Sequence, residues 1–145
     1  MNYLLSHWNY RISFWLTLLT GVLLLWQYPA AKGGAGHVGR WAAALALSVF
    51  VVYMNTLVAG SRPHPPIVNP RHIGFMTFHQ NVGLIYFALM AVMPFFGGAL
   101  FWLRKRPGRW PRAMRRAHRW LAYAAGITWL VSNIASEIGS RIPTI

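Results

Sequence analysis

The stretch from residue 103 to residue 120, LRKRPGRWPRAMRRAHRW, decides the fold class and orientation that the sequence predicts. It carries eight of the chain's fourteen basic residues and no acidic residue. Long uncharged apolar segments lie on both sides of it. Arginine and lysine close to the ends of transmembrane helices are retained on the cytoplasmic side of the membrane. We therefore expect residues 103–119 to form a cytoplasmic loop between two transmembrane helices.

The composition also indicates an integral membrane protein. Of the 145 residues, 56% are hydrophobic and 10% are charged, and Glu137 is the only acidic residue. Soluble domains usually contain about 25% charged residues. The net charge of +13 does not point to nucleic acid, because the basic residues lie at the ends of apolar segments. The chain has no cysteine, which excludes cysteine-ligated iron–sulfur clusters and covalently attached c-type haem.

Four apolar segments can each cross a bilayer, which takes about 20 residues. We expect helices at about 8–28, 41–59, 77–102 and 117–137, with a kink at Pro94 in the third. The connections are short, so the predicted fold is all-α: a single domain over 1–145, forming an up-down-up-down four-helix bundle. The basic loop then places both termini on the outer, periplasmic side of the cell inner membrane. His64 and His72 fall in the proline-rich outer connection.

One histidine lies near the starting end of each predicted helix: His7, His37, His79 and His118. Helices one and three start at the outer face, and helices two and four start at the inner face. In an up-down bundle these are the diagonal pairs, so His7 can face His79 and His37 can face His118. His72 or His64 could take the place of His7. Two imidazoles from opposite helices suit the iron of haem b. The sequence therefore predicts one or two haem b groups. If there are two, one lies near each membrane face.

Arginines accompany three of these histidines on the same helix face. Arg11 follows His7 by four residues, Arg40 follows His37 by three, and Arg115 precedes His118 by three. Guanidinium groups match carboxylates, so these arginines could bind haem propionates. Small residues such as Gly83 would leave room for a porphyrin. A single histidine at a membrane interface is more commonly a polar anchor, so the haem interpretation depends on the placement in all four helices.

Two short segments resemble the cytochrome b561-like and ferric-reductase-like membrane cytochromes. They are His118-Arg119-Trp120-Leu121-Ala122-Tyr123 and Phe78-His79-Gln80-Asn81-Val82-Gly83. Members of those families are helical bundles that hold haem b between histidines of alternate helices. The resemblance implies electron transport through haem b, between a quinone pool and a partner redox protein. It is a likeness at the level of the fold.

Glu137 has two interpretations. A carboxylate at membrane depth is a candidate for taking protons from a quinol. The interpretation that we favour is an ion pair with Arg141, four residues further along the helix. No catalytic triad, phosphate-binding loop or dinucleotide fingerprint is present in the sequence. We therefore expect an electron-transfer or anchor subunit of a larger membrane redox complex rather than a stand-alone enzyme.

Two other functions stay open. The first is a haem-free accessory or assembly subunit, held by the basic loop against partner proteins and anionic lipid headgroups. The second is a small metal or solute carrier, with His64, His72, Met76 and His79 as candidate ligands for copper on the outer side.

Overall fold

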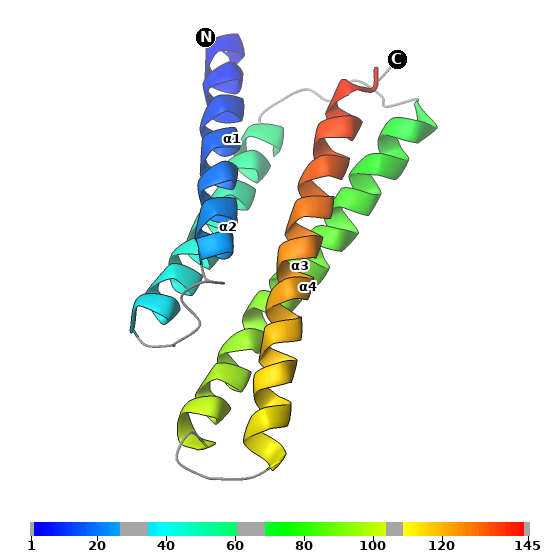
Figure 1. Ribbon diagram of the computed structural model, residues 1–145. Helices are drawn as coiled ribbons and strands as arrows, with labels where there is room; N and C mark the ends of the chain where they lie inside the picture. The colour runs from blue at the N-terminus through cyan, green and yellow to red at the C-terminus, as the bar shows by residue number, and fades with distance from the viewer. Residues whose placement is uncertain (1, 27–34, 61–68, 104–108, 144–145) are drawn as a thin grey trace. The chain divides into compact units, whose positions relative to one another are not determined.

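The computed structural model describes residues 2–26, 35–60, 69–103 and 109–143, with the side chains of 2–10, 35, 58–60 and 109–111 left out of the description. These described residues are helical over nearly their whole length and contain no strand, which confirms the all-α prediction. The four helices are α1 (Asn2–Trp26), α2 (Ala35–Gly60), α3 (Pro70–Leu103) and α4 (Arg109–Arg141), as Figure 1 shows.

The helices pack in consecutive pairs, and the chain divides into two compact units. Met1–Pro65 contains α1 and α2, and Pro66–Ile145 contains α3 and α4. Within the first unit the Ser13 hydroxyl donates a hydrogen bond to Asn55 Oδ1 at 3.2 Å, so the middle of α1 lies beside the last two turns of α2. In each unit the two helices run antiparallel, as Figure 1 shows.

Helix α3 begins seven residues earlier than the apolar pattern predicts. Asn69 caps it, because its Oδ1 accepts a hydrogen bond from the backbone N–H of Arg71 at 3.1 Å. Pro70 occupies the first helical position, where its missing N–H costs nothing. The prediction that His72 lies in the outer connection is therefore wrong, since His72 lies in the first turn of α3. The helix also continues through Pro94.

Helix α4 also begins early, within the basic stretch. It starts at Arg109, so most of the predicted cytoplasmic loop 103–119 is helical. Arginine is a good helix former, and Pro111 is tolerated in the first turn. The prediction of a loop is wrong for residues 109–119, and residues 104–108 lie outside the described part.

Helices α3 and α4 meet along a seam with the spacing of a coiled coil. Along α3, the residues that face α4 are spaced alternately three and four positions apart. Along α4, the residues that face α3 are spaced seven positions apart. Buried or half-buried residues occupy both faces, and Gly139, Gly83 and Gly97 allow close approach. The α3 face is Met76, His79, Gly83, Tyr86, Met90, Met93 and Gly97, and the α4 face is His118, Ala125, Ser132 and Gly139.

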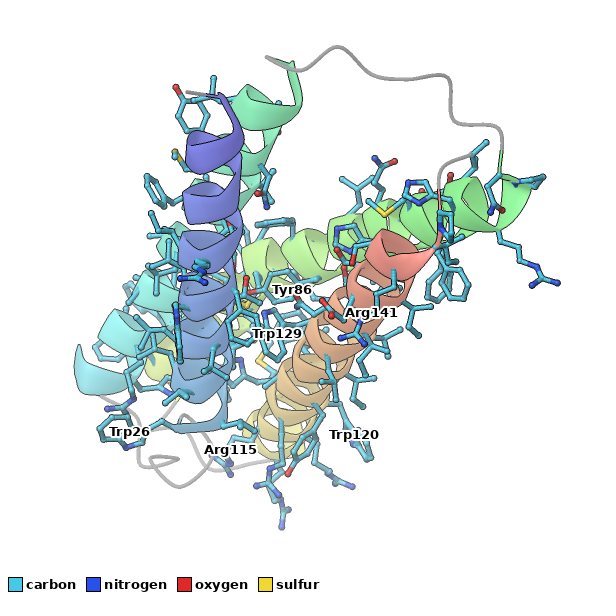
Figure 2. All side chains as sticks on the ribbon, turned by 90° about the horizontal axis from the view of Figure 1, so that it is seen from above. Trp26, Tyr86, Arg115, Trp120, Trp129 and Arg141 are labelled. Carbon is cyan, nitrogen blue, oxygen red and sulfur yellow. The ribbon has the colours of Figure 1, made fainter. Side chains whose placement is uncertain are left out.

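Two of the described helical segments are long and apolar enough to cross a membrane. They are Gly36–Leu57 of α2 and Pro70–Leu103 of α3. Arg11–Trp26 of α1 is a shorter apolar segment, and the arginines of α4 lower its mean hydropathy. Large apolar side chains are exposed on all four helices, as in Figure 2, where the side chains project outward from the ribbons. The multi-pass topology itself stays a prediction.

Candidate functional site at the helix histidines

The four predicted ligand histidines lie inside four different helices, whereas the predicted bounds placed His7 and His37 just before theirs. His7 is in α1, although its side chain lies outside the described part. His37 is in the first turn of α2 and is half-buried. His79 and His118 are both in the third turn of their helices, α3 and α4, because these helices start earlier than predicted.

His79 is held by Ser132 of the neighbouring helix. The Nδ1 atom of His79 lies 2.8 Å from the carbonyl oxygen of Ser132 and 2.9 Å from its hydroxyl. The Ser132 hydroxyl donates to the carbonyl oxygen of His79 at 3.1 Å. A carbonyl can only accept, so the proton of a neutral His79 ring is on Nδ1. Its Nε2 then carries the lone pair that a metal ion requires.

His118 lies against Gly97 of α3 at the other end of the same helix pair. The ring Cε1 of His118 is 3.8 Å from the position that a Cβ on Gly97 would occupy. A methyl group would fit there in ordinary contact, but a larger side chain would meet the imidazole. Gly97 therefore provides the space in which this ring lies.

His79 and His118 lie at different levels of the helix pair. Ser132, which contacts His79, and His118 are fourteen residues apart along α4, which is about 21 Å at 1.5 Å per residue. One iron cannot bind both rings across that distance. If both are ligands, they belong to two separate sites.

Arg40 and Trp41 follow His37 in α2, and both carry N–H groups with no acceptor within the described part of the chain. The atoms are Arg40 Nε and Trp41 Nε1, and both are buried. Glu137, the chain's only acidic residue, is occupied elsewhere. Buried N–H donors without an acceptor are rare in native proteins, so each calls for an explanation. Arg11 and Arg115, the other predicted partners for a propionate, are exposed.

Glu137 forms the predicted ion pair with Arg141. The Nε and Nη2 atoms of Arg141 donate to Oε1 of Glu137 at 2.9 and 2.6 Å. Both side chains are exposed to a large extent. The favoured interpretation of Glu137 as a paired residue at the helix end is therefore confirmed.

Each diagonal histidine pair takes one residue from each compact unit, so both pairs stay predictions. Within the described residues, no three histidine, cysteine or acidic side chains converge on a possible metal position. His64 of the predicted copper site lies outside the described part. A haem iron needs only two histidines from the protein, and two side chains do not make a group of three. The haem prediction is therefore not tested by this finding.

One expectation about space for a porphyrin is wrong. Gly83 does not open a pocket, because the Ser132 hydroxyl lies 3.5 Å from the position of its missing Cβ. The small residue allows α3 and α4 to approach closely. Serine is not a typical haem ligand, so residue type alone does not single out Ser132. The signal that could have found it is its spacing of fourteen residues from His118, two heptads along one helix face.

Comparisons with protein-family models, curated proteins and solved structures found no match to this chain.

Proposed function

We propose that the protein is a membrane b-type cytochrome subunit that carries electrons through haem b, between a quinone pool and a partner redox protein. In this proposal it crosses the inner membrane four times, with the basic stretch on the cytoplasmic side. His7 and His79 hold one haem near the outer face, and His37 and His118 hold another near the inner face.

The distribution of polar groups supports a membrane environment. Large apolar side chains are exposed on every helix, whereas Ser13, Thr20, Ser48 and Ser132 are buried. Hydroxyl groups return hydrogen bonds to carbonyls of the preceding turn, as Thr20 does to Leu16 at 2.9 Å. This arrangement suits a protein whose solvent is hydrocarbon, where polar groups must be satisfied internally.

The observation that carries the haem proposal is the pair of N–H donors beside His37. Arg40 Nε and Trp41 Nε1 are buried without an acceptor in the described part of the chain. The only acidic side chain, Glu137, is bound to Arg141 in the other unit. A carboxylate would accept hydrogen bonds from the two donors, and a metal ion in the same ligand could bind the imidazole. Haem b has this combination, with its propionates and its iron.

His79 fits the same chemistry at the outer level. A histidine that ligates a metal almost always donates its other ring N–H to a carbonyl or carboxylate, which fixes the tautomer and raises the basicity of the ligating nitrogen. The bond from His79 Nδ1 to the Ser132 carbonyl has this form. His79 would thus be one ligand of the outer haem, and His118 one ligand of the inner haem.

Bound haem b would supply one-electron exchange between ferric and ferrous iron. The chain's own residues would bind and orient it. Ser132 would hold the His79 ring in one orientation, and Arg40 would offset the negative charge of a propionate. The exposed apolar surfaces of the helices would keep the sites in hydrocarbon, away from water.

Absorption spectroscopy of histidine variants tests this function. The protein is produced with ample haem precursor and purified, and the pyridine haemochrome spectrum gives the ratio of haem b to protein. His118→Ala and His79→Ala should each lose one haem, whereas His72→Ala should keep the wild-type ratio. Unchanged ratios in both ligand variants would refute the assigned ligands, and a wild-type protein without haem would favour an accessory subunit.

A further inference from the structure

One exposed face of α4 changes from arginine to apolar side chains along its length. Its residues follow one another at spacings of three and four, which places them on a single helix face. This face lies on the opposite side of α4 from His118, Ala125 and Ser132, the residues of the seam with α3. The face consists of Arg112, Arg116, Arg119, Tyr123, Ile127, Leu130 and Ile134, and all of these side chains are exposed.

Within the described part of the chain, no acidic side chain pairs with the arginines of this face. Glu137 is the only acidic residue, and it is bound to Arg141 near the opposite end of α4. The first turn of α4 also contains no acidic residue. Arginines at a helix start add to the positive end of the helix dipole, so an external anion there is favoured by both charges.

We propose that this face binds an anionic phospholipid of the cytoplasmic leaflet. The phosphate would pair with Arg116 and Arg119, since guanidinium groups bind phosphate oxygens in a bidentate manner. The acyl chains would then lie along Tyr123, Ile127 and Leu130. This inference rests on the membrane setting proposed above and does not depend on haem.

The dimensions of the face agree with those of a lipid. Tyr123 and Ile134 are eleven residues apart, about 16 Å along the helix, and one leaflet contributes about 15 Å of hydrocarbon. Trp120 is 69% exposed and lies between the arginine and aliphatic parts, with its ring 5.8 Å from that of Tyr123. Tryptophan and tyrosine commonly lie at headgroup level. Figure 2 labels Arg115 and Trp120 among the side chains that project from this part of α4.

A free phosphate ion would share only the charged part of this site. It would meet the arginines but leave the apolar part without a ligand. A zwitterionic phospholipid would meet the apolar part but carry no net charge. An anionic lipid should therefore bind more tightly than either, and salt should weaken it because the arginines are exposed.

Thermal unfolding of the full chain in a neutral detergent tests the proposal. Phosphatidylglycerol, phosphatidylcholine or inorganic phosphate is added over a concentration series. We expect phosphatidylglycerol to raise the melting temperature at concentrations where the other two have no effect. The double variant Arg116→Gln with Arg119→Gln should need about tenfold more phosphatidylglycerol, since each basic residue near the headgroups contributes to binding.

Arg71→Gln is the matched control, because Arg71 is an exposed arginine in the first turn of α3. It should respond like the wild type, and circular dichroism should show equal helix content in all variants. Equal effects of the two lipids, an equal effect of inorganic phosphate, or a wild-type response of the double variant would each overturn the proposal. Haem content is measured on the same samples. The absence of haem would refute the cytochrome proposal, but the melting temperatures would still test lipid binding.

Discussion

His79 and Ser132 exchange hydrogen bonds between α3 and α4. The imidazole Nδ1 of His79 donates to the carbonyl oxygen of Ser132, and the hydroxyl of Ser132 donates to the carbonyl oxygen of His79. The exchange satisfies the hydroxyl and fixes both the tautomer and the orientation of the ring. It also sets the register of the helix pair at this level. The lone pair of a neutral ring is then on Nε2, the nitrogen that would bind the iron in the proposed function.

Replacing Ser132 tests its role as a positioning residue. Ser132→Ala keeps the main-chain acceptor of His79 but removes the hydroxyl, which lies 2.9 Å from the same Nδ1 atom and donates to the carbonyl oxygen of His79. We expect the outer haem to bind about tenfold more weakly, because loss of a group that supports a metal-ligating histidine typically costs 10–100-fold in affinity. A redox titration should also show a shift in the midpoint potential of that haem only.

Ser136→Ala, one helical turn further along α4, is the control. A purely structural role for Ser132 would lower the melting temperature and leave the midpoint potential unchanged. The positioning role is contradicted if the two serine variants have equal haem affinity and equal potentials.

Gly97 and Gly98 form a matched pair for testing the position of His118. A Cβ on Gly97 lies 3.8 Å from the His118 ring, whereas nothing lies within 4 Å of a Cβ on Gly98. Gly97→Leu should therefore displace the imidazole and reduce the inner haem to a small fraction of its wild-type content. Gly98→Leu should leave it intact. The pyridine haemochrome assay measures both, and equal haem contents in the two variants would show that the space beside His118 is not needed.

Glu137 is expected to be dispensable for electron transfer. Exposed ion pairs contribute about 0–1 kcal/mol, so Glu137→Gln should change the free energy of unfolding by no more than that. Haem content and the rate of haem reduction by a quinol should stay at wild-type values. A large drop in the reduction rate in Glu137→Gln, with a normal rate in Arg141→Gln, would instead support a proton-accepting role for the carboxylate.

The orientation in the membrane can be tested with single cysteines, because the chain has none of its own. Gly108→Cys lies in the basic stretch, and Ser140→Cys lies at the exposed end of α4. In intact cells with a permeabilised outer membrane, a thiol reagent that cannot cross the inner membrane should label position 140 and spare position 108. Labelling of position 108 alone would place the basic stretch outside and reverse the topology.

The apolar segments predicted four helices and an all-α fold, because an apolar segment of about 20 residues has the length of a transmembrane helix. They did not predict where the helices begin. Asn69 with Pro70 caps and starts α3 inside a stretch that looks like a loop, and Arg109 starts α4 inside a stretch that looks like a charged connection. Helix propensity and capping, rather than hydropathy, decide these ends.

The candidate site was predicted in part. The histidines could be identified because imidazole is a suitable ligand and each predicted helix carries one. The partners that hold His79 and His118 depend on which faces of α3 and α4 meet. Those faces are set by the packing at the seam. There Gly97 is small enough to lie against the His118 ring, and the Ser132 hydroxyl donates to the carbonyl oxygen of His79. Such residues carry no signal of function until the register of the two helices is known.

The most direct test of the central claim is the ratio of haem b to protein in the purified wild-type chain, read from dithionite-reduced minus oxidised and pyridine haemochrome spectra. We expect two haem b groups per chain, each reduced by dithionite and each lost separately in His79→Ala and His118→Ala. A wild-type protein that is folded, inserted in the membrane and free of haem b would contradict it.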